Sequence, residues 1–177
     1  MKLETERLIL REFVAEDWRA VLAYQSDPLY LRYYHWSDRS PGNVRAFVNM
    51  FIEFQQEQPR TKFQLAIVLK ENAQLIGNCG IRINNVELRE ANIGYELNSQ
   101  YWGQGYATEA ARAVLRFGFE ELEMHRIYAT TLAANIGSSK VLAKLGMRLE
   151  ARQLEKEFIK GRWYDSLTYA MLDREWF

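Results

Sequence analysis

The stretch Tyr101-Trp-Gly-Gln-Gly-Tyr-Ala-Thr-Glu-Ala110 is the most informative part of this chain. Its two glycines, Gly103 and Gly105, follow an apolar run and directly precede a helix-like pattern. A turn of this kind points several backbone N–H groups at one place, where the dipole of the following helix also favours negative charge. We therefore expect a phosphate-bearing ligand at this turn.

Two common phosphate-binding motifs are excluded by the residues around the glycines. A dinucleotide-binding fingerprint requires a third Gly or Ala, and Thr108 occupies that position. A P-loop ends in Gly-Lys-Ser or Gly-Lys-Thr, and the stretch has no such ending. The rest of the chain must therefore identify the ligand.

Composition and charge limit the classes of protein to which the chain can belong. Hydrophobic residues make up 48% of the 177 residues, which is enough for a single domain over residues 1–177 with a sizeable core. Lys and Arg together number 23, as do Asp and Glu, so the formal net charge is zero. Broad capture of nucleic acid or of an anionic membrane relies on excess positive charge, so neither partner is expected.

Cysteine and histidine are scarce. The single Cys79 excludes an intrachain disulfide and a multi-cysteine metal site, and we expect it to be a buried core residue. The two histidines are too few for a histidine-rich centre, so no metal is expected. No apolar run reaches the roughly 18 residues of a spanning helix, and residues 1–7 are too charged for a signal sequence. We expect a cytoplasmic protein, either a monomer or a homodimer.

Hydrophobic periodicity predicts a single α+β layer architecture. Strands are expected over residues 8–13, 63–69, 74–83, 92–97, 126–131, 147–154 and 166–172. Helices are expected over residues 15–25, 43–58 and 137–145, and directly after the glycine turn. Short connections among the three strands between residues 63 and 97 favour antiparallel neighbours. In the last of these, Ile93, Tyr95 and Leu97 point to one face and Glu96 to the other.

The glycine turn has a companion motif later in the chain, Asn135-Ile-Gly-Ser-Ser-Lys-Val-Leu-Ala-Lys-Leu-Gly-Met147. Together with the opening Thr5-Glu-Arg-Leu-Ile-Leu-Arg11, the two motifs resemble the GCN5-related N-acetyltransferases (GNAT), in particular the ribosomal-protein N-terminal (RimJ/RimL-like) branch. The resemblance covers nearly the whole chain. It implies the GNAT fold, a mixed and mostly antiparallel sheet of six to seven strands flanked by about four helices. It also implies a splayed strand pair that holds the arm of coenzyme A.

The same resemblance implies a donor, acetyl-CoA, and roles for individual residues. The amides of the glycine turn hold the pyrophosphate, Asn135 contacts the pantetheine arm, and amides near Leu97 polarise the thioester carbonyl. Ser138 donates a hydrogen bond to the departing thiolate, with Ser139 as the alternative. Capping of the following helix is a compatible role for Asn135 and Ser138. The residues implied to bind acetyl-CoA are Leu97, Trp102, Gly103, Gln104, Gly105, Tyr106, Ala107, Thr108, Asn135 and Ser138.

Acetyl transfer to nitrogen requires a neutral amine. Deprotonation at pH 7 costs about 1–1.5 kcal/mol for an α-amine and about 4–5 kcal/mol for a lysine. A carboxylate can accept this proton directly or through water. The resemblance to the ribosomal-protein branch favours Glu157, and the resemblance to other branches favours Glu96. A solvent-facing strand glutamate without a catalytic role is the alternative for both.

These observations lead to an acetyl-CoA-dependent N-acetyltransferase that acts by direct attack in a ternary complex. The acceptor is a primary amine, on a protein N-terminus or on a small molecule such as a polyamine or an aminoglycoside. A CoA-binding regulatory module without turnover is the alternative class.

Two groups of residues bear on the acceptor. Polyamines favour an acidic pocket, which could be formed by Glu87, Glu90, Glu96, Glu155 and Glu157. The aromatic run Tyr30, Tyr33, Tyr34 and Trp36 could form a wall of the acceptor site, although ordinary packing is the favoured interpretation.

Overall fold

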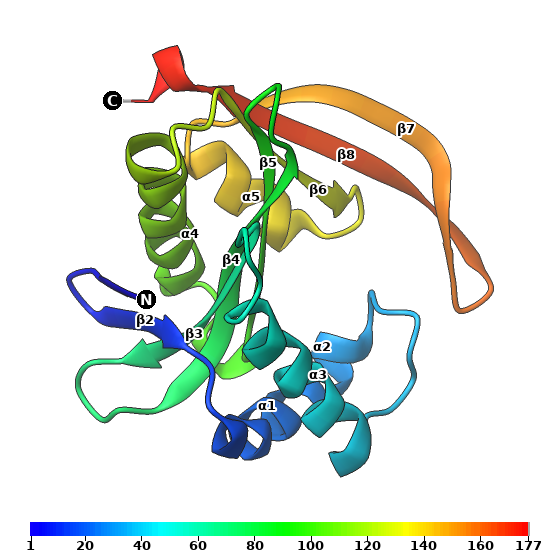
Figure 1. The fold of residues 1–177 in the computed structure, drawn as a ribbon. Helices are drawn as coiled ribbons and strands as arrows, with labels where there is room; N and C mark the ends of the chain where they lie inside the picture. Colours follow the sequence, from blue (N-terminus) through cyan, green and yellow to red (C-terminus); the bar gives the residue numbers. More distant parts are fainter. Residues whose placement is uncertain (177) are drawn as a thin grey trace.

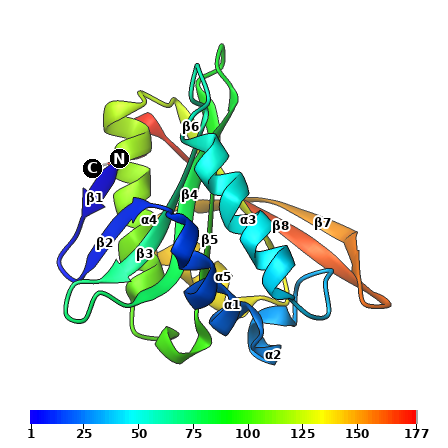
Figure 2. The ribbon, with the colours of Figure 1, turned by 60° about the horizontal axis from the view of Figure 1, so that its bottom comes forward.

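The computed structural model describes residues 1–176 and shows a mixed sheet covered by helices on both faces (Figures 1 and 2). The strands are β1 (Lys2–Glu4), β2 (Leu8–Glu12), β3 (Lys62–Leu69), β4 (Leu75–Asn85), β5 (Glu90–Leu97), β6 (Arg126–Leu132), β7 (Arg148–Ile159) and β8 (Arg162–Leu172). Their spatial order is β1-β2-β3-β4-β5-β6-β8-β7, and all neighbours are antiparallel except β5 and β6. The predicted mixed, mostly antiparallel sheet is confirmed.

Five α-helices accompany the sheet within the described residues. They are α1 (Trp18–Gln25), α2 (Pro28–Leu31), α3 (Pro41–Phe54), α4 (Tyr106–Arg116) and α5 (Ile136–Lys144). A π-helical turn extends α4 over Phe117–Glu121, and short 3-10 turns lie at Ala15–Asp17, Ser99–Tyr101 and Asp173–Glu175. None of the helices in residues 1–176 combines the length and the apolar character needed to cross a membrane.

The element counts exceed the prediction by one strand and about one helix. The extra strand is β1, which pairs with β2 at the edge of the sheet. The extra helix is α2, which begins at Pro28 because Asp27 caps it and proline suits the first helical position. Strand β7 also continues five residues beyond its predicted end at Leu154. The charged stretch from Glu155 to Glu157 lacks the apolar alternation of a half-buried strand, so the hydrophobic pattern did not predict this continuation.

Each face of the sheet carries its own apolar core. On one face, α4 and α5 bury Ala111, Leu115 and Leu142 against the strands. On the other face, α1, α2 and α3 form a second core that includes Val21 and Val48. The sheet lies between the two cores, and the apolar residues of β5 belong to the core under α4 and α5.

The predicted alternation along β5 is confirmed. Ile93, Tyr95 and Leu97 pack on the side of α4 and α5, whereas the Glu96 side chain contacts Tyr24 of α1 on the opposite side. The predicted burial of Cys79 is also confirmed, because the side chain has no exposed surface.

Strands β5 and β6 separate after a short region of pairing. Their parallel register covers only Glu90–Arg126, Ala91–Ile127 and Asn92–Tyr128 (Figure 1). Beyond this point β5 continues to Leu97 beside β4, and β6 continues to Leu132 beside β8. The splayed strand pair expected from the sequence is therefore present, and it opens the sheet between residues 93–97 and residues 129–132.

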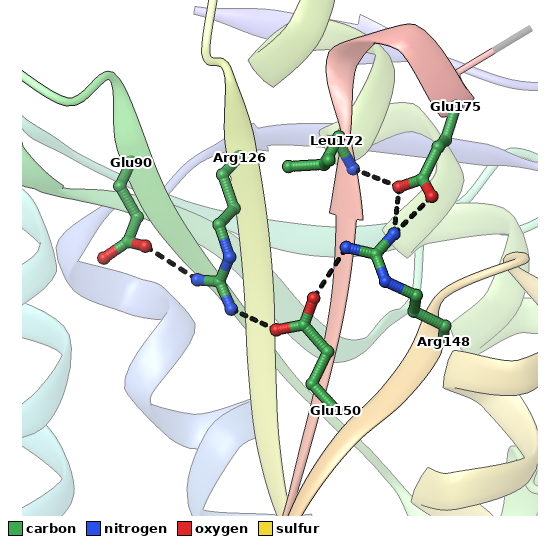
Figure 3. A network of polar contacts seen from close by, with 6 residues as sticks. All are labelled: Glu90, Arg126, Arg148, Glu150, Leu172 and Glu175. Carbon is green, nitrogen blue, oxygen red and sulfur yellow. Dashed lines mark hydrogen bonds and ion pairs between the residues drawn. The ribbon is translucent and has the colours of Figure 1, made fainter.

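An ion-pair network joins the strands at the closed end of this opening (Figure 3). Arg126 contacts Glu90 of β5 at 2.7 Å and Glu150 of β7 at 2.5 Å. Arg148 contacts Glu150 at 2.6 Å and also pairs with Glu175, near the end of the chain. Hydrogen bonds from Arg126 and, to a lesser extent, from Arg148 lower the pKa of Glu150. The network thus links β5, β6 and β7 where the sheet is still closed.

We predict that Arg126→Gln lowers the free energy of unfolding by about 1 kcal/mol, because it removes two partly exposed ion pairs from a network. Urea unfolding measures the loss, which high salt should reduce. The lowered pKa of Glu150 means that the contribution is present above pH 4.5 and fades as the pH falls through its folded-state pKa. Arg116→Gln is the control, because Arg116 is exposed and forms no ion pair within residues 1–176. Equal losses in the two variants would contradict the proposed contribution.

Candidate active site

The glycine turn presents unpaired backbone donors in front of α4. Gly103 and Gly105 have φ values of 76° and 87°, in the left-handed region that favours glycine. Among residues 1–176, the N–H groups of residues 103–108 find no backbone or side-chain acceptor, and Glu109 is the first to bond, to the Gly105 carbonyl at 3.0 Å. The turn therefore leaves a helix N-terminus whose free N–H groups suit an anion.

The N-terminal segment holds this turn in place. The Arg7 guanidinium donates to the Gln104 carbonyl at 3.0 Å and to Glu109 at 2.7 Å, and it lies 4.2 Å from the centre of the Tyr106 ring. The Thr5 hydroxyl donates to the same Glu109 carboxylate at 2.6 Å. The opening motif and the glycine turn therefore form one unit, although about 100 residues separate them.

The end of β5 is tied to the turn by Trp102. Its indole N–H donates to the Leu97 carbonyl at 2.8 Å. Asn98, the residue after Leu97, donates its backbone N–H to the Ile76 carbonyl of β4 at 2.7 Å. Because backbone groups alternate in direction along a strand, the N–H of Leu97 points away from β4, into the opening beside β6.

A cleft of about 660 Å³ occupies the opening between β5 and β6. It is lined by the end of β5, the glycine turn, the end of β6, the start of α5 and residues from Leu29 to Tyr34. Nine of the predicted acetyl-CoA contacts line it, namely Leu97, Trp102, Gly103, Gly105, Tyr106, Ala107, Thr108, Asn135 and Ser138. Gln104 does not line the cleft, because its carbonyl accepts from Arg7 and its side chain donates to Gln100. The exposed Lys140 and Lys144 do line it.

The start of α5 places Ser138 against β5. Asn135 caps the helix, since its side-chain oxygen accepts from the Ser138 N–H at 3.1 Å. The Ser138 Oγ lies 3.0 Å from the Tyr95 hydroxyl, which also donates to the Ser138 carbonyl at 3.1 Å. Ser139 does not line the cleft, and its Oγ is buried without a partner in residues 1–176.

Tyr95 is a cleft residue that the sequence analysis assigned only to a strand face. Burial raises the pKa of its hydroxyl, so the group stays protonated at neutral pH. The sequence signal that could have identified Tyr95 as a cleft residue was its place on the same strand face as Leu97. Its contact with Ser138 links residues 43 positions apart, which the sequence pattern does not reveal.

Glu96 lines the cleft and accepts five hydrogen bonds. Three reach Oε1, at distances of 2.6–2.9 Å, and two reach Oε2, at 2.8 and 3.2 Å. The donors are Tyr24, Gln25, Asn78, Tyr30 and Tyr34. Burial, followed by the charge of Glu96, raises the pKa of all three tyrosines, so they remain donors at neutral pH.

Further side chains orient two of these donors. Arg82 donates to Gln64 at 2.8 Å, Gln64 donates to Asn78 at 2.7 Å, and Asn78 donates to Glu96 at 2.6 Å. Arg39 donates to Gln25 at 2.9 Å and so leaves the Gln25 amide N–H for the carboxylate. The hydrogen bonds of this buried network all run towards Glu96, so the network holds the donors in place around the carboxylate.

Glu157 lies in the long β7–β8 hairpin and does not line the cleft. The register of β7 and β8 is interrupted between Gln153 and Glu157, so the direction of its side chain could not be read from regular alternation. The acidic pocket does not form as a group: among residues 1–176, Glu96 is the only carboxylate that lines the cleft, and Glu90 pairs with Arg126. Residues 1–176 contain no group of three His, Cys, Asp or Glu side chains arranged to hold a metal.

The aromatic segment after Pro28 forms part of the cleft wall. Tyr30, Tyr33 and Tyr34 line it, so the favoured interpretation as ordinary packing was incomplete. The Tyr33 hydroxyl donates to the Ala134 carbonyl at 2.9 Å, which joins this wall to the loop before α5. Trp36 does not line the cleft, and it stacks on Tyr34 at 4.9 Å.

Comparison with known proteins agrees with this arrangement. The model of the acetyltransferase (GNAT) domain family matches residues 7–148. The chain belongs to the GNAT acetyltransferase family. It is 35% identical to the uncharacterised N-acetyltransferase YnaD of Bacillus subtilis over 177 residues, which cover 99% of each protein. This GNAT protein is thus an acetyl-CoA-dependent N-acetyltransferase.

Solved structures share the whole fold of this GNAT protein. A GNAT-family acetyltransferase from Bacillus anthracis is 32% identical, with a TM-score of 0.86 and coverage of 99% of this chain and 100% of that chain. The ribosomal L7/L12 α-N-protein acetyltransferase RimL, in complex with coenzyme A, is 18% identical. It has a TM-score of 0.85 and covers 97% of this chain and 98% of its own. The expected GNAT fold is confirmed.

We predict that Gly103→Ala weakens acetyl-CoA binding whereas Gly161→Ala does not. Gly103 and Gly161 have φ values of 76° and 78°, and no heavy atom of residues 1–176 lies within 4 Å of an added Cβ at either, but only Gly103 lines the cleft. The backbone strain should therefore be similar, about 1–2 kcal/mol in each variant, measured by urea unfolding. Calorimetric titration measures acetyl-CoA affinity, and equal affinity in the two variants would contradict the assignment of the turn as the phosphate site.

Proposed function

We propose that this GNAT enzyme transfers the acetyl group of acetyl-CoA to a primary amine by direct attack in a ternary complex, within the cleft between β5 and β6. One observation carries the proposal: a single cleft is lined by the unpaired amides before α4, by Ser138 and by Glu96. The amides suit an anion, and the carboxylate suits an amine that must lose a proton.

The donor side of the cleft fits acetyl-CoA, which supplies the acetyl thioester when bound. The open amides of residues 103–108 suit its pyrophosphate, and Lys140 and Lys144 of α5 add positive charge to the lining. The Leu97 N–H, directed into the cleft, is placed to polarise the thioester carbonyl. The parted strand β5 offers unpaired backbone groups along which an extended pantetheine arm can bind.

Ser138 and Tyr95 are proposed to assist departure of the thiolate. The Tyr95 hydroxyl holds Ser138 at the cleft, because it donates to the Ser138 carbonyl at 3.1 Å and its oxygen lies 3.0 Å from the Ser138 Oγ. A hydrogen bond from Ser138 then stabilises the charge that develops on sulfur.

Direct attack agrees with the state of Cys79. Its thiol is fully buried, and burial raises its pKa to about 12. A buried, protonated thiol is a poor nucleophile, so an acyl-enzyme on Cys79 is disfavoured.

Glu96 is the proton acceptor that the geometry favours. It lines the cleft, whereas Glu157 does not. Glu157, which the family resemblance preferred, stays a prediction that comparison of Glu96→Gln and Glu157→Gln can test.

The charge of the cleft favours an acceptor with one amine over a polyamine or an aminoglycoside. Within the described part of the chain, residues 1–176, the charged residues that line it are Arg32, Glu96, Lys140 and Lys144. Three cations and one carboxylate suit CoA phosphates and a single amine better than a polycation. We therefore propose the α-amine of a peptide or protein, consistent with the name of RimL as a protein α-N-acetyltransferase.

A panel of amines tests this function. Release of CoA from acetyl-CoA is measured with short peptides beginning with serine, alanine or methionine, and with spermidine and kanamycin. We expect turnover with at least one peptide and higher kcat/KM for peptides than for the two polycations. Tight acetyl-CoA binding without turnover on any amine would instead support a CoA-binding regulatory module.

We predict that Ser138→Ala lowers kcat about ten- to a hundredfold on the best peptide, because a hydrogen bond to a charged group is worth about 1.5–3 kcal/mol. The dissociation constant of acetyl-CoA should change little, since the Asn135 cap uses the backbone N–H of Ser138. Ser139→Ala is the matched control and should keep its kcat. Unchanged turnover in Ser138→Ala would remove Ser138 from the mechanism.

A further inference from the structure

The two oxygens of the Glu96 carboxylate have different surroundings. One accepts hydrogen bonds from residues outside the cleft lining, and the other accepts from two tyrosine hydroxyls that line the cleft. The three donors to Oε1, which lie outside the cleft lining, are Tyr24, Gln25 and Asn78. The two donors to Oε2, which both line the cleft, are Tyr30 at 2.8 Å and Tyr34 at 3.2 Å. The path from the cleft to the carboxylate therefore leads through tyrosine hydroxyls.

This saturation limits direct proton transfer to Glu96. A carboxylate offers about four lone-pair positions, and five donors already occupy them. An amine that reached Oε1 or Oε2 would have to displace a donor and leave a buried hydroxyl or amide unsatisfied, which is costly. The oxygen atoms of Tyr30 and Tyr34 keep acceptor capacity of their own, because each phenol donates one hydrogen and can accept another.

We propose that Tyr30 and Tyr34 relay the proton of the acceptor amine to Glu96. In this step one N–H bond of the protonated amine breaks, and the released proton binds the hydroxyl oxygen of one tyrosine. The original hydroxyl proton of that tyrosine moves to Oε2 of Glu96. The amine is left neutral, the tyrosine is again a phenol, and Glu96 is protonated. The reverse shift returns the proton to solvent after the product leaves.

The surroundings support a concerted relay. Burial, with the charge of Glu96, raises the pKa of both tyrosines, so neither is ionised between turnovers. Their rings stack at 4.5 Å, and Tyr34 stacks in turn on Trp36. The two hydroxyls are thus held on the same carboxylate oxygen.

The relay rests on the proposed function and is tested by three tyrosine-to-phenylalanine variants. Tyr24→Phe is the matched control, because Tyr24 makes a 2.6 Å bond to Glu96 but does not line the cleft. Wild type, Tyr24→Phe, Tyr34→Phe and the double variant Tyr30→Phe/Tyr34→Phe are assayed on the best peptide of the panel. Acetyl-CoA affinity by calorimetry and thermal unfolding report whether each variant is folded and binds the donor.

We expect kcat to fall about a hundredfold in the double variant, at the lower end of general acid–base effects, because water can replace the lost hydroxyls. Tyr34→Phe should show an intermediate loss, and Tyr24→Phe, which removes a donor to Glu96 but no member of the relay, should lose less kcat than Tyr34→Phe. The dependence of kcat on the deuterium fraction of the solvent should be curved in wild type, since two protons move together.

Other outcomes would overturn the relay. If Tyr24→Phe lowers kcat as much as the double variant, the tyrosines only hold Glu96 in place. If the double variant keeps wild-type kcat, the proton takes another route. Failure of the wild type to acetylate any amine of the panel would instead overturn the proposed function, and the relay with it.

Discussion

The parting of β5 from β6 after three residue pairs is the constraint on which the rest of the structure depends. A sheet that remained paired to Leu97 would hide the backbone groups that now face the cleft. The parted strands are held from both outer sides, since β5 pairs with β4 and β6 pairs with β8 along their length. The opening therefore adds no free edge at the outside of the sheet, and its unsatisfied groups are confined to the place where a ligand can bind.

Separate contacts hold the two ends of this opening. At the closed end, Arg126 joins β5 to β7 through carboxylates on both (Figure 3). At the open end, the Trp102 indole occupies the carbonyl of Leu97, and Arg7 with Glu109 holds the glycine turn against the N-terminal segment. These contacts hold the N-terminus of α4 and the end of β5 on the same cleft.

The alternation of β5 divides the chemistry between the two cores of the protein. Tyr95 and Leu97 serve the side of α4 and α5, where Ser138 lies, and Glu96 serves the side of α1 and α2, where its tyrosine donors lie. Consecutive residues of one strand thus reach both the proposed leaving-group side and the proposed amine side.

Local sequence features predicted the elements that form the proposed donor side. The glycine spacing, the helix that follows and the Asn135–Met147 motif are local features, and local backbone preferences and caps decide their structure. The alternation of residues 93–97 and the burial of Cys79 could also be read from periodicity. The residues of the proposed amine side are brought together only by the tertiary structure. The donors to Glu96 come from positions 24, 25, 30, 34 and 78, and the partner of Ser138 comes from position 95. Such contacts depend on how α1, α2 and α5 pack on the sheet, and no local pattern records which side chains that packing brings together.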